Sequence, residues 1–122
     1  MMHKSPTLTV IIPTFNEEGY IQDALKSVAF ADEIILIDSF SEDTTVALAT
    51  PHVSKVISRE FDNFSNQKNE ALKHAKSQWV LFLDADERVT QSLEKEIIET
   101  LQNPMHSGYK INFPHFYMNR FL

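Results

Sequence analysis

The stretch WVLFLDADE, residues 79–87, contains five consecutive apolar residues directly before a pair of aspartates, Asp84 and Asp86. A short run that is apolar throughout is typical of a β-strand buried on both faces, as in a parallel sheet covered by helices. Similar runs at residues 8–12 and 33–37 are followed by Pro13 and by Asp38. We therefore predict three buried strands, each followed by a loop that carries polar residues.

Apolar residues at helical spacing lie between these strands, at residues 21–29, 64–75 and 93–101. Asn16 is predicted to cap the first helix, Ser41 a short helix that ends near Ala49, and Thr90 the last one. A further strand is predicted at residues 53–58, and residues 109–117 are expected to be extended. Alternating strands and helices predict an α/β fold, with one open, mostly parallel sheet and flanking helices in a single domain.

The composition excludes several classes of protein. The net charge of −6, with no basic stripe, argues against a nucleic-acid partner. The absence of cysteine excludes disulfides, thiolate metal sites and cysteine nucleophiles, and it fits a cytoplasmic protein. With only two glycines, a Gly-rich phosphate loop is excluded, and the five histidines show no metal-ligand spacing.

The pair Asp84 and Asp86 is the sharpest chemical feature. Carboxylates two residues apart, in a loop after a buried strand, can converge on one hard cation such as Mg²⁺ or Mn²⁺. Such an ion would leave positions open for diphosphate oxygens and stabilise the charge of a leaving diphosphate. The alternative is a pair of solvated acids that end the strand before the helix at Thr90.

Two further residues are candidates for ligand binding. Asp38 can accept hydrogen bonds from a base or from ribose hydroxyls, or it can be a turn residue that ends its strand. Lys68 is predicted to share the inward face of its helix with Ala71 and Leu72, near the helix end that points toward the cleft. The alternative for Lys68 is that its stem lies along the rim of the sheet.

Four ordered stretches resemble the motifs of family 2 glycosyltransferases, which have the GT-A fold, and together they cover nearly the whole chain. They are VIIPTFNEE at 10–18, ADEIILIDSFSEDT at 31–44, QKNEAL at 67–72 and WVLFLDADE at 79–87. The second and third stretches look closest to the lipopolysaccharide-core β-1,4-glucosyltransferase subgroup. The resemblance implies a Rossmann-like nucleotide-binding half and a one-step inverting transfer from a nucleoside-diphosphate sugar, taken as a uridine diphosphate sugar, to a glycan or a lipid-linked acceptor.

The resemblance also implies roles for individual residues. The loop after the first strand would hold the base through its backbone, Asp38 the nucleoside and Lys68 the base or the diphosphate. Asp84 would contact the ribose and the metal, and Asp86 would be the main ligand of Mn²⁺ or Mg²⁺. The predicted nucleotide-sugar-binding residues are Pro13, Thr14, Phe15, Glu17, Asp38, Lys68, Asp84 and Ala85, and the predicted metal ligands are Asp84 and Asp86.

This chain departs from the family in two respects. Family members are roughly twice as long, so the chain is interpreted as the donor-binding part, cut before the acceptor-binding part, with the catalytic base beyond residue 122 and little or no transfer alone. An exposed aromatic C-terminal surface would then favour self-association, and the whole protein could touch the inner face of the plasma membrane. Phe40 and Asn119 stand where the subgroup usually has glycine, so the loop after Asp38 is expected to differ.

Two other functions stay open at this point. One is a phosphohydrolase of the haloacid-dehalogenase type, with Asp84 as nucleophile and Asp86 as acid, although those enzymes carry the pair after the first strand. The other is a non-catalytic binding or assembly module that retains the fold.

Overall fold

The computed structural model describes residues 7–108, 112–113 and 120–121, and its main feature is a four-stranded parallel sheet. The strands are β1 (Leu8–Thr14), β2 (Glu33–Asp38), β3 (Lys55–Ser58) and β4 (Trp79–Phe82). Their order is β3-β2-β1-β4, and β1 pairs along its length with β2 and over Leu8 to Ile11 with β4. Two short strands, β5 (Asn112–Phe113) and β6 (Arg120–Phe121), pair with each other.

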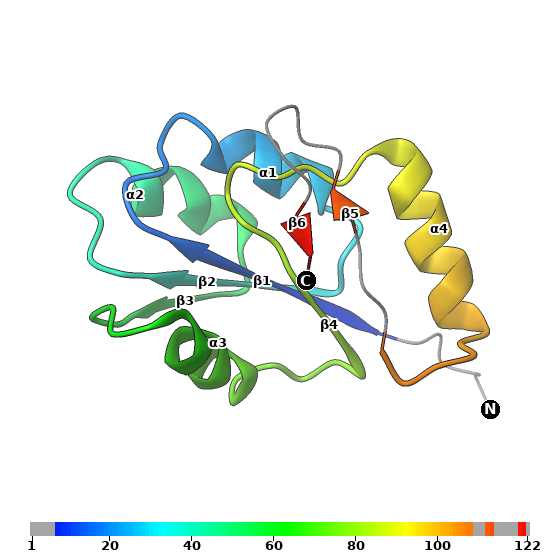
Figure 1. Cartoon of the computed structure of the whole chain (residues 1–122). Coiled ribbons are helices and arrows are strands. Elements are labelled where there is room, and N and C mark those ends of the chain that lie inside the picture. The colour runs from blue at the N-terminus through cyan, green and yellow to red at the C-terminus, as the bar shows by residue number, and fades with distance from the viewer. Residues whose placement is uncertain (1–6, 109–111, 114–119, 122) are drawn as a thin grey trace.

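Helices cover both faces of the sheet (Figure 1). The helices α1 (Ile21–Ser27) and α2 (Thr45–Ala49) cover one face, and α3 (Phe64–Leu72) covers the other. A short 3-10 helix (Thr50–His52) follows α2, and α4 (Gln91–Gln102) packs beside β4. The predicted α/β fold with flanking helices is confirmed.

The core consists of two clusters, one on each face of the sheet. Alternate side chains of β1 divide between them, with Val10 and Ile12 in the larger cluster and Ile11 in the smaller one. The larger cluster includes Ala24, Leu25 and Ile97 from α1 and α4, and the smaller one includes Ala71 from α3. Because the inner strands are buried on both faces, they read as continuous apolar runs in the sequence.

Most predicted elements occur, with shifted ends and two wrong caps. Thr90 caps α4 as predicted, since its hydroxyl accepts a hydrogen bond from the N–H of Leu93 at 3.1 Å. Ser41 does not cap α2, because its hydroxyl donates to Asp38 and the helix begins only at Thr45. Asn16 does not cap α1 either, because four residues separate it from the start of that helix at Ile21.

Two apolar positions also differ from expectation. Pro13 lies inside β1 rather than ending it, which is possible because pairing with β4 stops at Ile11 and no ladder needs the missing N–H. Of the apolar residues at 93–101, which are predicted to form one helix face, Ile97 is buried but Ile98 is 41% exposed. The extended segment expected at 109–117 lies outside the described residues except for β5.

The strand order creates a switch point beside β1. From β1 the chain continues to β2 and β3 on one side, and β4 then pairs on the other side. In open parallel sheets, ligands bind outside the carboxyl ends of the strands at such a point. The loops after β1 and β4 are therefore the expected walls of a ligand site.

Within the described residues, no helix combines the length and apolar character that crossing a bilayer would require.

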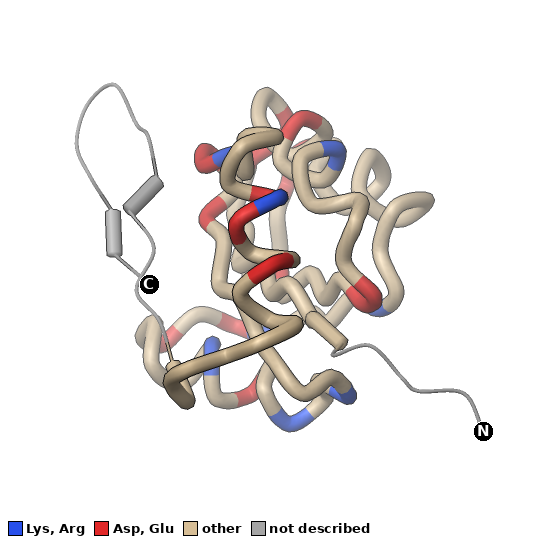
Figure 2. The backbone as a smooth tube through the Cα atoms, turned by 90° about the vertical axis from the view of Figure 1, so that its right-hand side faces the viewer, with Lys and Arg blue, Asp and Glu red and all other residues tan. Residues whose placement is uncertain are grey.

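Figure 2 looks onto α4, where acidic residues and a single lysine follow one another along the helix.

Candidate functional site

A pocket of about 550 Å³ lies at the carboxyl ends of the strands, on the switch point between β1 and β4. It is lined by Pro13, Thr14, Phe15, Glu17, Ser39, Phe61, Phe64, Gln67, Asp84, Ala85 and Asp86. A second pocket of about 490 Å³ lies along β4 and α4, and among the described residues that line it Glu96 alone is charged. Paired carboxylates therefore distinguish the first pocket, although the two have similar volumes.

The loop that carries the aspartate pair is held as a tight turn. The backbone N–H of Asp84 donates to Oε1 of Glu87 at 2.8 Å, and the N–H of Glu87 donates to the carbonyl of Asp84 at 2.9 Å. Between the two aspartates, Ala85 is buried, so the loop is anchored at its centre. This alternation leaves Asp84 and Asp86 half-buried in the pocket wall.

Arg88 ties this turn to the start of α1. Its guanidinium donates to the carbonyl oxygen of Ala85 at 2.6 Å and to that of Tyr20 at 2.9 Å. A rigid guanidinium that donates to two carbonyls restrains both segments. The position of the aspartate pair relative to the first loop is therefore fixed by the chain itself.

The loops after β1 and β2 are joined by six hydrogen bonds. Asn16, with φ of 53°, donates its N–H to Ser41 and accepts from the N–H of Glu42, both at 2.8 Å. Glu18 accepts two more from Thr44, at 3.1 and 2.6 Å. Asparagine tolerates positive φ well, which explains its place at this turn.

Phe40 also has positive φ, at 58°, in the loop after β2. The loop therefore adopts a left-handed turn here although the residue is not glycine, and the two hydrogen bonds from Ser41 to Asp38 hold the turn around it. Its side chain is 60% exposed.

Asp38 is 2% exposed and does not line the pocket. Its Oδ1 accepts from the hydroxyls of Thr14 at 2.7 Å and Ser41 at 2.6 Å, and its Oδ2 accepts from the N–H of Ser41 at 2.8 Å. The carboxylate thus connects the ends of β1 and β2 beneath the pocket, and its predicted contact with the nucleoside stays a prediction.

Lys68 does not line the pocket either, because its ammonium lies over the ring of Phe82, 5.1 Å from the centroid. On α3 the buried positions are Gln67 and Ala71, one helical turn apart, while Leu72 is 39% exposed. The inward face of α3 is thus centred on Gln67. The prediction that Leu72 lies on this inward face together with Lys68 and Ala71 is wrong.

The pocket has excess negative charge. Burial raises the pKa of the Glu17 carboxyl, and the neighbouring negative charges of Asp86, Asp84 and Asp43 raise it further. Neighbouring carboxylates disfavour one another's ionisation, and a bound cation would reduce the repulsion between them. Glu17, Asp84 and Asp86 therefore share one electrostatic environment.

Four pocket residues were not predicted from the sequence: Ser39, Phe61, Phe64 and Gln67. Ser39 and Gln67 stand next to Asp38 and Lys68 in the sequence and line the pocket in their place, whereas ligand binding by Asp38 and Lys68 stays a prediction. Phe61 and Phe64 lie edge to face, with centroids 5.1 Å apart, and they remain 47% and 66% exposed. The available sequence signal for this wall was two phenylalanines three residues apart, Phe61 after β3 and Phe64 at the first position of α3.

Comparisons with known proteins bear on this architecture. The family model described as "Glycosyl transferase family 2" matches residues 9–122. The chain belongs to this family. The sequence had predicted this membership from its four ordered motifs, and the match favours a transferase over the phosphohydrolase alternative.

Relatives within glycosyl transferase family 2 are longer than this chain. An uncharacterized glycosyltransferase of Rickettsia bellii is 37% identical over 91 residues, which are 74% of this chain and 31% of the relative. The lipopolysaccharide core biosynthesis glycosyltransferase LpsC of Rhizobium meliloti is 30% identical over 106 residues, 83% of this chain and 39% of the relative. The chain thus spans 31% to 39% of the length of these relatives, and the predicted likeness to lipopolysaccharide-core enzymes is confirmed.

Solved structures share the fold. Glucosyl-3-phosphoglycerate synthase from Mycobacterium tuberculosis, solved with Mn²⁺, uridine diphosphate and glucosyl-3-phosphoglycerate, superposes with a TM-score of 0.68 at 24% identity, covering 82% of this chain and 41% of that one. Residues 1–349 of TarS from S. aureus superpose with a TM-score of 0.62 at 28% identity, covering 78% and 32%. The predicted GT-A architecture is confirmed.

Proposed function

We propose that this chain binds a nucleoside-diphosphate sugar, specifically a uridine diphosphate sugar, together with Mn²⁺ or Mg²⁺ in the pocket between the ends of β1 and β4. The observation that carries the proposal is the presence of Asp84 and Asp86 in one pocket with the loop after β1, at the switch point of the sheet. In the whole protein this site would supply the donor for transfer to a glycan or a lipid-linked acceptor.

The residues present suit a divalent cation that arrives with its nucleotide. Asp84 and Asp86 offer carboxylate oxygens, which Mg²⁺ and Mn²⁺ prefer. The pKa of Glu17 is raised first by its burial and then by the negative charges of Asp86, Asp84 and Asp43. Within the described part of the chain, no group of three His, Cys, Asp or Glu side chains could hold a metal ion. Diphosphate oxygens and water would complete the coordination, so metal and nucleotide should each increase the affinity for the other.

The other walls suit the nucleoside. Phe15, Phe61 and Phe64 are all more than 45% exposed and line the same pocket, which gives a planar base apolar contacts. The bound metal supplies positive charge that stabilises the leaving diphosphate. This chain's residues bind and orient the donor, with the Asp84 turn held by Glu87 and the first loop held through Asp38.

Calorimetric titration of uridine diphosphate and its glucose conjugate, with and without Mn²⁺, tests the proposal. We expect binding of uridine diphosphate that needs Mn²⁺, and a loss of about tenfold or more in Asp86→Asn, because one of two protein ligands is weakened. Asp23→Asn is the matched control, since Asp23 is an exposed acid on α1 away from the pocket. Equal affinity of wild type and Asp86→Asn, or binding indifferent to Mn²⁺, would contradict the proposal.

A further inference from the structure

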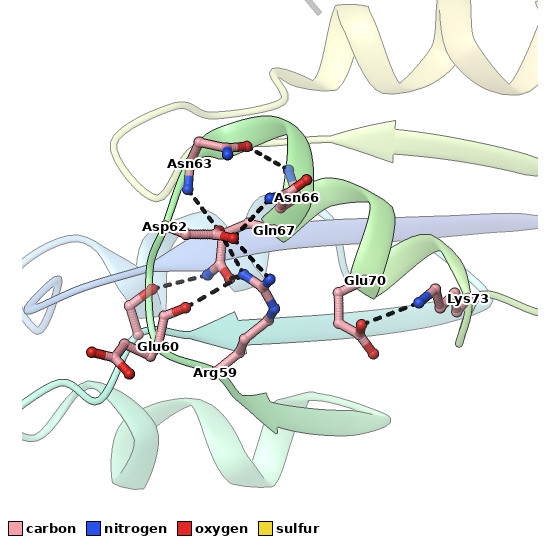
Figure 3. Close-up of polar contacts among 9 residues, drawn as sticks. Arg59, Glu60, Asp62, Asn63, Asn66, Gln67, Glu70 and Lys73 are labelled. Carbon is pink, nitrogen blue, oxygen red and sulfur yellow. Dashed lines mark hydrogen bonds and ion pairs between the residues drawn. The ribbon is translucent and has the colours of Figure 1, made fainter.

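A chain of hydrogen bonds connects the residues at the start of α3 (Figure 3), and it continues through Gln67 to Ser39. It begins at Asp62, which accepts from Nη1 and Nη2 of Arg59 at 2.9 and 3.2 Å. Arg59 Nη1 also donates to Oε1 of Gln67 at 2.6 Å, and Nε2 of Gln67 donates to the hydroxyl of Ser39 at 2.9 Å. The last member, Ser39, lines the pocket.

The direction of every bond in this chain is set by Arg59. A guanidinium can only donate, so the carboxamide atom of Gln67 that faces it must be the oxygen. Nε2 must then face Ser39, and Ser39 Oγ must accept. Gln67 is 1% exposed, so its side chain has no room to turn over in solvent.

Arg59 is itself fixed in place. Hydrogen bonds from Arg59 first, then from Asn66 and the backbone N–H of Asn63, hold the pKa of Asp62 well below its usual range, so Asp62 stays ionised. Asn63 also caps α3 by accepting from the N–H of Asn66 at 2.8 Å. The start of the helix and the guanidinium thus form one network.

The hydrogen bond from Gln67 determines where the hydroxyl proton of Ser39 can point. Its oxygen already accepts from Gln67, and among residues 7–108 its proton meets no acceptor. Because Ser39 lines the pocket, that proton is available to a ligand there. The serine is therefore presented as a hydrogen-bond donor.

The position of Ser39 indicates which part of the ligand it meets. Ser39 follows β2, two strands away from β4, so it lies about 10 Å from the aspartate pair at the usual strand spacing. If the diphosphate lies with the metal at Asp84 and Asp86, the nucleobase reaches the end near Ser39, beside Phe61 and Phe64. A pyrimidine base carries carbonyl oxygens that accept hydrogen bonds.

We infer that Ser39 donates a hydrogen bond to a carbonyl oxygen of the bound pyrimidine base, with Gln67 and Arg59 as positioning residues that fix the direction of the bond. The inference rests on the proposed function, since it needs the diphosphate at the aspartate pair. It makes Ser39 a determinant of base specificity, because a base with an N–H donor at that place meets the serine proton unfavourably.

The test reverses the hydrogen bond without changing the shape of the side chain. In Gln67→Glu the carboxylate keeps its partner Arg59 but can only accept, so Ser39 turns its proton toward residue 67 and away from the pocket. We expect Ser39→Ala to bind uridine diphosphate with Mn²⁺ about fivefold more weakly, as for one neutral hydrogen bond, and Gln67→Glu at least as weakly. The double variant should match Ser39→Ala, because the effect of residue 67 passes through the hydroxyl.

A second probe, ribose 5-diphosphate with Mn²⁺, lacks the base. Wild type and Ser39→Ala should bind it equally, and a fivefold loss there would overturn the assignment to the base. A further loss in the double variant would show that Gln67→Glu acts through charge or misfolding, which also overturns the inference. If wild type binds with Mn²⁺ and loses affinity in Asp86→Asn, but Ser39→Ala and Gln67→Glu bind as tightly as wild type, the inference about Ser39 fails and the proposed function stands. If wild type shows no Mn²⁺-dependent binding, the proposed function and the inference both fail.

Discussion

Removing the carboxylate of Asp38 should destabilise the fold more than removing any exposed acid. The side chain is 2% exposed and accepts three hydrogen bonds, from Thr14 Oγ1, Ser41 Oγ and the N–H of Ser41. A hydrogen bond to a charged group contributes about 1.5–3 kcal/mol, and a neutral one about 1 kcal/mol. Asp38→Ala loses all three and leaves buried donors without an acceptor, so we expect a loss of about 4.5 kcal/mol or more.

Asp38→Asn should be milder for a geometric reason. The Oδ2 position faces a backbone N–H that cannot reverse, so the asparagine oxygen must occupy it. The amide nitrogen then faces the two hydroxyls, which can reverse and accept. All three contacts survive without charge assistance, and the expected loss is about 2 kcal/mol.

Urea unfolding followed by circular dichroism measures both variants, with Asp23→Asn as an exposed control expected within about 0.5 kcal/mol of wild type. Thr14→Val removes one of the three bonds and should cost about 1.5 kcal/mol. If Asp38→Ala loses less than about 1 kcal/mol, the role of Asp38 in joining the two strand ends is refuted.

Three further outcomes follow from single residues. Phe40→Gly should be about 0.7 kcal/mol more stable than Phe40→Ala in urea unfolding, because both lose the ring but glycine alone tolerates the φ of 58° freely; equal stability of the two would show that the turn is unstrained. The raised pKa of Glu17 means that its contribution to stability is present below its ordinary value of 4.5 and is lost as the pH rises through the folded value. Glu17→Gln should therefore gain stability relative to wild type between pH 4 and pH 7, and a constant difference across that range of pH would contradict this sign. Thr90→Ala should cost about 1 kcal/mol through loss of the cap on α4, whereas Thr90→Ser should be nearly neutral.

The sequence predicted the sheet and the pocket well, because both follow from local patterns. Buried parallel strands read as apolar runs, and the residues after them meet at one edge, which brought Pro13, Glu17 and Asp84 into one pocket. The failures lie where the partner is distant in the chain. Ser41 resembles a helix cap locally, yet its hydroxyl contacts Asp38 and the N–H of Asn16, and no local pattern reveals the second contact.

The other wrong prediction concerned which residues of α3 face the sheet. The helix has a weakly amphipathic sequence, so choosing Lys68 or Gln67 as the inward residue depended on a shift of one position. The structure decides it through Arg59, which follows β3 and reaches across to Gln67. Such a contact depends on how β3 and α3 are placed, and periodicity alone cannot provide it.

The bonds between the loops after β1 and β2 also matter for protein engineering. Six hydrogen bonds connect residues 16–18 with residues 41–45, and several use the side chain of one loop to satisfy the backbone of the other. A chimera that transplants the first loop alone from another family member would lose hydrogen bonds of backbone N–H groups on both sides. The smallest exchangeable unit is therefore both loops together, and their residues should change in concert during evolution.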